Sequence, residues 1–158
     1  MPDTDWVLLA YRMPREPSTP RIAVWRKLRR LGAVQLVDGL VALPSDPATV
    51  EAFDWLADEV IEAGGEAWTW RAMPGSKQQD RALRERVSTA VVEEFKALIL
   101  EAKEAGSDAS RRTVDRLRRE LRAIEGRDRF GVREREQARA LIEQLAARLD
   151  APDRESAR

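Results

Sequence analysis

The sequence predicts an α+β fold in which a sheet-and-helix domain is followed by a helical unit. Three observations predict it. Short apolar runs alternate with helix-period stripes over residues 1–73, an Asp-Gly pair separates two of these runs, and from Pro74 onward only helix-period patterns remain. The predicted boundaries are therefore 1–73 for the first domain and 74–150 for a helical unit packed on it, with a disordered tail at 151–158.

The first domain contains four runs with the composition of buried strands, at residues 6–11, 33–37, 40–43 and 66–71. Asp38-Gly39 between the second and third runs is a strong hairpin signal, because both turn positions favour a positive φ.

Two helices are expected between these strands. Ser18 or Thr19 caps the first helix and Gly32 ends it. Ser45-Asp46-Pro47 opens the second helix, and Gly64-Gly65 ends it. The apolar face of the first helix is predicted to be Ile22, Val24, Trp25, Leu28 and Leu31. The inner face of the second is predicted to be Val50, Phe53, Ala57, Val60 and Ile61.

The resulting order is β-α-β-β-α-β within about 70 residues. This is the ferredoxin-like plan, a four-stranded antiparallel sheet with two helices on one face. The fold class is therefore α+β, with a ferredoxin-like βαββαβ domain followed by an antiparallel three-helix C-terminal unit.

The three C-terminal helices are predicted from their apolar stripes. The first covers 78–105 and ends at Gly106, and Ser107-Asp108 is expected to cap the second, which ends at Gly126. The stripes are Leu83, Val87, Val91, Phe95, Leu98 and Ala102; then Val114, Leu117, Leu121 and Ile124; then Ala138, Leu141, Leu145 and Leu149.

The amino-acid composition argues against several classes of protein. The chain has no cysteine and no histidine, which removes thiolate metal sites, cysteine nucleophiles and the commonest general base. No apolar run reaches the roughly 18 residues of a membrane span, and no signal-peptide pattern is present. We expect a cytoplasmic protein that is not an enzyme and holds no cofactor or metal.

The net charge is zero, but basic and acidic residues are distributed unevenly along the chain. Residues 1–44 carry seven basic and four acidic groups, whereas residues 45–72 carry one basic and seven acidic groups. Of the 28 basic residues 24 are arginine, a bias that either anion binding or a GC-rich genome explains.

Three groups of arginines are candidate DNA- or anion-binding residues. Each has a competing interpretation in which the charges only pair with nearby acids. The first group surrounds a proline-rich turn, the second lies on the first helix facing the acidic second helix, and the third lies on the helix near residue 115. They are Arg12, Arg15 and Arg21; then Arg26, Lys27 and Arg30; then Arg112, Arg116 and Arg119.

The tryptophans are predicted to be mainly structural. Trp6 and Trp25 are assigned to the core. Trp68 and Trp70 share one face of the last strand, where they either belong to the core, form a dimer interface, or stack on bases.

The sequence resembles the N-terminal domain of the ChrB family of bacterial chromate-resistance regulators. The resemblance rests on residues 11–21 and 24–33, on Asp38-Gly39, on the Trp68/Trp70 strand and on residues 127–131, and it extends over roughly 4–150. The first half also resembles the middle domain of PaaX-type repressors and, through it, ferredoxin-like CRISPR nucleases. Those nucleases use an aspartate where this chain has Ala10-Tyr11-Arg12, so cleavage is not expected.

The resemblance implies a role in transcriptional control of chromate resistance, with DNA and the chromate oxyanion as expected partners. Full-length ChrB proteins carry a second, C-terminal domain. A second role therefore stays open, in which the chain is a protein-interaction module that docks a co-encoded partner carrying that domain. The sequence also leaves open whether the chain forms a homodimer.

Overall fold

The computed structural model describes residues 5–151, which divide into two compact units, one up to Val87 and one from Ser88 on. The boundary falls inside the long helix α3 (Lys77–Ala105). The predicted tail lies, apart from Ala151, outside the described residues. Packing of the helical unit on the first domain stays a prediction.

The first unit contains a four-stranded antiparallel sheet of β1 (Trp6–Arg12), β2 (Val34–Val37), β3 (Leu40–Pro44) and β4 (Glu66–Ala72). The strand order is β2-β3-β1-β4, so β1 is central and β4 is an edge. The α+β class is confirmed, and each strand lies within one or two residues of its predicted range.

The β2–β3 hairpin turns at Asp38-Gly39, as predicted, but only Gly39 has a positive φ, of 75°. The prediction that both turn residues take positive φ is therefore wrong. Glycine is required for a second reason: a Cβ at Gly39 would lie 2.5 Å from the Tyr11 carbonyl oxygen. The Tyr11 amide donates a 2.8 Å hydrogen bond to the Gly39 carbonyl, which joins the turn to β1.

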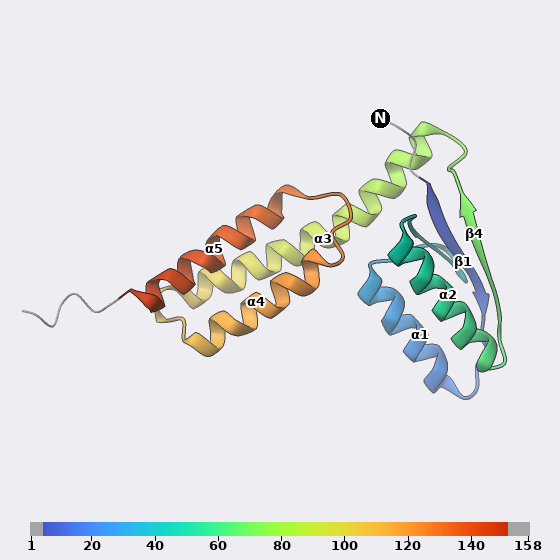
Figure 1. The fold of residues 1–158 in the computed structure, drawn as a ribbon, viewed down its shortest axis with the longest axis horizontal. Helices are drawn as coiled ribbons and strands as arrows, with labels where there is room; N and C mark the ends of the chain where they lie inside the picture. The colour runs from blue at the N-terminus through green and yellow to red at the C-terminus, as the bar shows by residue number, and fades with distance from the viewer. Residues whose placement is uncertain (1–4, 152–158) are drawn as a thin grey trace, which may run out of the picture. The chain divides into compact units, whose positions relative to one another are not determined.

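Helices α1 (Ser18–Leu31) and α2 (Pro47–Glu62) lie side by side against one face of this sheet (Figure 1). The α2 start is a capping box, since the Asp46 carboxylate accepts from the Thr49 amide at 2.8 Å and the Thr49 hydroxyl accepts from the Asp46 amide at 2.9 Å. The α1 N-cap is instead Pro17, without a side-chain hydrogen bond, so capping by Ser18 or Thr19 is wrong.

The core of the first unit lies between these helices and the sheet. From α1 it takes Val24 and Leu28, which stand four residues apart, whereas Trp25 is 51% exposed. Ile22, at 43% exposure, and Ile61 of α2 also lie outside the core. The predictions for these three residues are wrong. For Ile22 and Trp25, the buried stripe of a helix advances 3.6 residues per turn and the three-residue spacing drifts off it. Ile61 directly follows Val60, which already occupies the buried side of α2.

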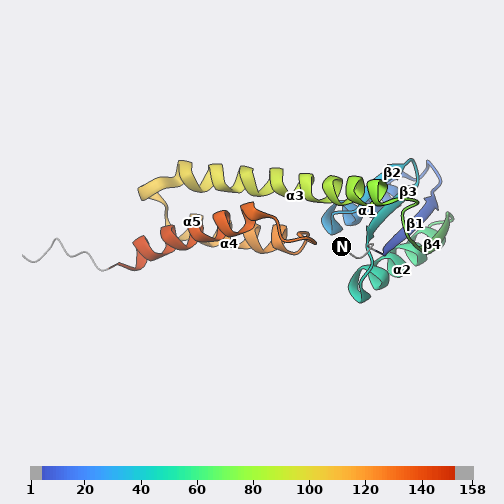
Figure 2. The same cartoon turned by 90° about the horizontal axis from the view of Figure 1, so that it is seen from above.

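The second unit is helical, with the later part of α3, α4 (Arg111–Glu125) and α5 (Arg133–Asp150) (Figure 2). Residues 106–108 form a 3-10 turn and the α4 cap is Ser110, so capping by Ser107-Asp108 is wrong. Among the α5 residues, Ile142 is fully buried while Leu141 and Leu149 are half-buried against the core. The shared core contains Val91, Phe95, Leu98, Ala102, Val114, Leu117, Leu121, Ile124, Ala138, Ile142 and Leu145.

Within residues 5–151, no helix combines the length and the apolar character that crossing a membrane requires.

Candidate functional site

The exposed side of α1 carries two adjacent ridges of side chains spaced four residues apart. Arg21, Trp25 and Arg29 form one ridge, and Ile22, Arg26 and Arg30 form the other. All six side chains are exposed. We call this surface, Arg21, Ile22, Trp25, Arg26, Arg29 and Arg30, the α1 basic face.

The positive charge of this face is largely uncompensated. The helix contains no acidic residue. Arg21, Arg26 and Arg30 form no ion pair with any of residues 5–151. The Arg29 guanidinium lies 4.9 Å from the centre of the Trp25 ring, which orders both side chains without neutralising the charge.

Lys27 behaves differently from its neighbours. Its ammonium pairs with the Glu59 carboxylate of α2, so this residue fulfils the prediction that the first helix pairs with the acidic second helix. Both side chains are partly buried. Lys27 therefore joins the two helices and is not part of the α1 basic face.

The arginines of the proline-rich turn are not equivalent. Arg12 ends β1 and pairs with Glu66 of β4 at 3.0 Å, and both side chains are well exposed. Arg15 lies in the loop before α1, exposed and without an ion pair in the described part of the chain. Because a carboxylate sits against Arg12, this side of the turn is a poor place for an oxyanion.

The α4 arginines are interleaved with acids. Arg116 donates to Glu101 of α3 at 2.8 Å and to Glu120 at 3.0 Å, and these hydrogen bonds raise the pKa of Arg116 above its usual value. Arg111 and Arg118 also pair with carboxylates of α5. Arg112 and Arg119 are exposed and form no ion pair with residues 5–151.

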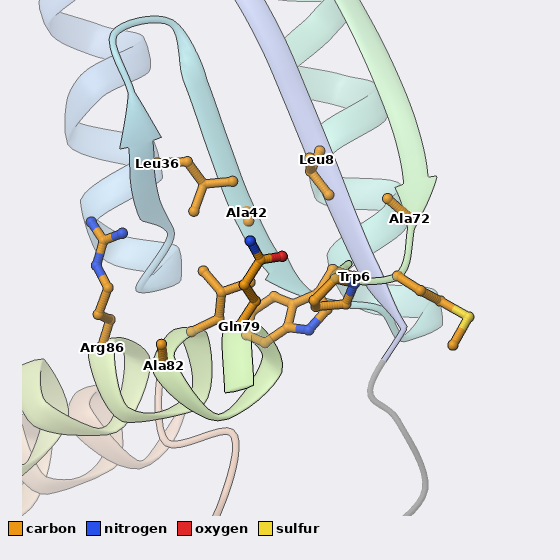
Figure 3. A pocket seen from close by; sticks show the side chains of 11 residues that line it. Trp6, Leu8, Leu36, Ala42, Ala72, Gln79, Ala82 and Arg86 are labelled. Carbon is orange, nitrogen blue, oxygen red and sulfur yellow. The ribbon is translucent and has the colours of Figure 1, made fainter. Parts of the chain in front are cut away.

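A cavity of about 350 Å³ lies between the sheet face away from α1 and α2 and the first turns of α3 (Figure 3). Trp6 forms one wall, held by an indole N–H hydrogen bond of 3.0 Å to the buried carboxylate of Asp80. Gln79 and Arg86 are the polar members of an otherwise apolar lining, which does not suit a dianion such as chromate. The lining residues are Trp6, Leu8, Leu36, Ala42, Ala72, Met73, Pro74, Gln79, Ala82, Leu83 and Arg86.

The Trp68 and Trp70 side chains lie on the same sheet face as this cavity, because they pair with Ala10 and Leu8 of β1. They are 67% and 58% exposed. Assignment of this pair to the core is therefore wrong, and the interface and base-stacking interpretations stay open.

Sequence reasoning missed three members of the α1 basic face. It assigns Ile22 and Trp25 to the apolar side of the helix, and it omits Arg29 from the candidate residues although Arg29 belongs to the same basic run. The i, i+4 spacing of Arg21, Trp25 and Arg29 was the signal that links them. No group of three or more potential metal ligands occurs among residues 5–151.

These features describe a mixed α+β unit with an uncompensated basic helix, joined to a three-helix unit. The sequence matches the family described as "Protein ChrB, N-terminal" over residues 21–111, more than half of the chain. The chain therefore belongs to the ChrB N-terminal family. Arg21, Arg26, Lys27 and Arg30 lie inside the matched range; Arg12, Arg15, Arg112, Arg116 and Arg119 lie outside it.

The protein named Protein ChrB from Cupriavidus metallidurans (strain CH34) is 32% identical over 83 residues, 52% of this chain and 26% of that relative. The aligned part thus spans about a quarter of the relative's length.

Proposed function

We propose that this chain is a non-enzymatic regulator of chromate resistance that binds DNA through the α1 basic face. Membership of the ChrB N-terminal family supports the regulatory role. The observation that carries DNA binding is the exposed, acid-free side of α1, where four arginines flank an exposed tryptophan.

This arrangement has the chemistry of a phosphate-backbone contact. Guanidinium groups donate paired hydrogen bonds to phosphate oxygens, and arginines that are already exposed and unpaired lose no internal ion pair on binding. At 1.5 Å per residue, the 14 residues of α1 extend about 21 Å, enough to meet several phosphates. Trp25, with Arg29 over its ring, adds a flat surface beside the charges.

We also assign the first unit to the ferredoxin-like architecture. The strand order β2-β3-β1-β4 and the placement of α1 and α2 on one face support it. In this architecture the basic face points away from the sheet, so DNA would contact the helix layer.

The test is a fluorescence-anisotropy titration of the protein against the upstream DNA of its own operon, at several salt concentrations. Four phosphate contacts predict a slope of about −3.6 in log K against log salt. The variant R26A/R30A is expected to reduce that slope by about 1.8 and to weaken binding at least tenfold at low salt. Absence of saturable binding at low salt would contradict the proposal.

The matched control is R112A/R119A, which removes two exposed, unpaired arginines from α4. It changes the net charge equally, so equal weakening by both variants would mean that DNA binding is not specific to the α1 basic face. Titrations with chromate, and with sulfate as a charge-matched anion, test the chromate response. A change in DNA affinity with chromate but not with sulfate would place chromate sensing within this chain. No change with chromate would place sensing elsewhere.

A second candidate function is a protein-interaction module that docks a partner carrying the C-terminal ChrB domain. The exposed apolar side chains on the open sheet face, above all Trp68 and Trp70, favour it. A stable complex with a co-encoded protein, without DNA affinity at low salt, would select this function over the first.

A further inference from the structure

The outer edge of β4 is unusual among the strands of this sheet. β4 is an edge strand seven residues long, and no other strand among residues 5–151 pairs with its outer side. Long edge strands expose unpaired N–H and C=O groups, which natural proteins usually block with proline, a bulge or inward charges. Glu66–Ala72 contains no proline, and its pairing with β1 runs through all seven residues without a shift.

The three central residues of this edge, Trp68-Thr69-Trp70, read alike in both directions. Trp68 and Trp70 stand on either side of Thr69 and share one face of the sheet, and Ala67 and Arg71 follow on the other face. Because the central Trp-Thr-Trp triplet is symmetric, a two-fold antiparallel pair of β4 strands centred on Thr69 brings each tryptophan opposite a tryptophan.

We propose that two copies of this chain associate through antiparallel pairing of their β4 strands, centred on Thr69. In this register Thr69 faces Thr69 of the second copy, and Trp68 faces Trp70 of the second copy. All four tryptophans then form two cross-strand aromatic pairs on one face of a continuous sheet. The inference is independent of DNA binding.

Charge selects the antiparallel direction. An in-register parallel pair would place Arg71 beside Arg71 and Glu66 beside Glu66, which is unfavourable. In the antiparallel pair, Arg71 faces Ala67 and Glu66 faces Ala72, so no like charges meet. Shifting the register by two residues toward Trp68 would put Glu66 opposite Trp70 and break up the aromatic pairs.

The available area fits a reversible dimer. With roughly 250 Å² for a fully exposed tryptophan side chain, the exposed fractions of Trp68 and Trp70 leave on the order of 600 Å² on the four side chains. Stable interfaces bury about 1,200–2,000 Å² in total, and the strand backbones and flanking side chains supply only part of the difference. We therefore expect a dissociation constant in the micromolar range.

The test is sedimentation velocity of the full chain over roughly 1–200 µM, which brackets that range. The wild-type protein is expected to shift from monomer to dimer. W68K/W70K and W68E/W70E each place like charges opposite one another and should remain monomeric throughout. Their equimolar mixture pairs Lys with Glu at both positions and should recover a heterodimer.

W55K is the matched control, because Trp55 is 66% exposed on the side of α2 that faces α1, where it lies beside Lys27 and Arg30. It should dimerise like the wild type. Far-UV circular dichroism checks that each variant is folded, which exposed positions should permit. The proposal would be overturned if the wild-type protein stayed monomeric over this concentration range, or if W68K/W70K still formed dimers. It would also be overturned if the W55K variant failed to dimerise.

Discussion

Helices α1 and α4 are the two arginine-rich helices of this chain, and they use the same residue differently. In α1, 14 residues carry five basic groups and no acid; in α4, 15 residues carry six arginines and three acids. One basic group of α1 pairs with a carboxylate, that of Lys27. Three arginines of α4 do so.

Arginine density alone therefore does not identify a binding surface. What matters is whether carboxylates stand within reach, on the same helix at i±4 or on a neighbouring helix. In α4 the acids of α3 and α5 supply them for Arg111, Arg116 and Arg118, which link α4 to the neighbouring helices. Among residues 5–151, the one carboxylate that pairs with α1 is that of Glu59 on α2, and it pairs with Lys27.

The largest expected effect is a loss of stability of the helical unit when the packing of α4 is disrupted. Leu117 is fully buried in the helical core, so Leu117→Ala should lower the free energy of unfolding of that unit by about 2–5 kcal/mol. Urea denaturation followed by circular dichroism measures it. Leu100→Ala, at an exposed position of α3, is the control and should cost under about 0.5 kcal/mol. Equal effects would mean that α4 is not held by its apolar stripe.

A smaller loss of stability is expected when an ion-paired arginine of the helical unit is replaced. Arg127 follows α4 and pairs with Glu94 of α3, with 17% of its side chain exposed. Arg127→Ala should cost about 1 kcal/mol, near the upper end for exposed pairs because the site is partly buried. A double-mutant cycle with Glu94→Ala isolates the pair. Additive losses would show that the two charges do not stabilise each other.

The unpaired arginines of α1 should leave stability unchanged. Replacing Arg26 and Arg30 by alanine removes no ion pair and relieves repulsion within the helix, so we expect a change within about 0.5 kcal/mol. Thermal melts at low and high salt measure it. A clear loss of stability at low salt would mean that these arginines have structural partners and would weaken their assignment to a binding face.

The smallest expected effect is on the pH dependence of stability, and it comes from a tyrosine in the first unit. Burial raises the pKa of Tyr11, the single tyrosine of the chain, above its usual value near 10. The neutral phenol is favoured in the folded state, so this stabilisation is present below about pH 10 and is lost as the pH rises through the folded-state pKa. Absorbance at 295 nm follows it. Leu117→Ala should leave the midpoint unmoved unless the two units unfold together.

The sequence predicted the elements well, because their signals are local. Ser45-Asp46-Pro47 marks the start of α2, Gly32 the end of α1 and Asp38-Gly39 the hairpin, and each signal spans one to three residues. The stripe through Val114 and Leu117 predicted the buried side of α4 correctly, since every member is buried.

The candidate site was less predictable, because exposure and pairing depend on neighbours distant in sequence. Trp25 looks like a core residue by its chemistry, yet Val24 and Leu28 already fill that side of α1. Whether Arg116 or Arg26 is paired depends on where Glu101 and α2 lie after folding. The tryptophans of β4 are exposed because they lie at an edge strand and on the sheet face away from α1 and α2, facts of topology that the local pattern does not contain.

The uneven burial of the tryptophans has a consequence for spectroscopy. Trp6 is 1% exposed, while the other four are at least half exposed. The folded protein should therefore emit at long wavelength, with most of its fluorescence quenched by acrylamide. Unfolding will shift the spectrum little, since one indole leaves an apolar environment. The same emission will respond strongly to any molecule that covers α1 or β4, so intrinsic fluorescence in this chain reports on binding more than on folding.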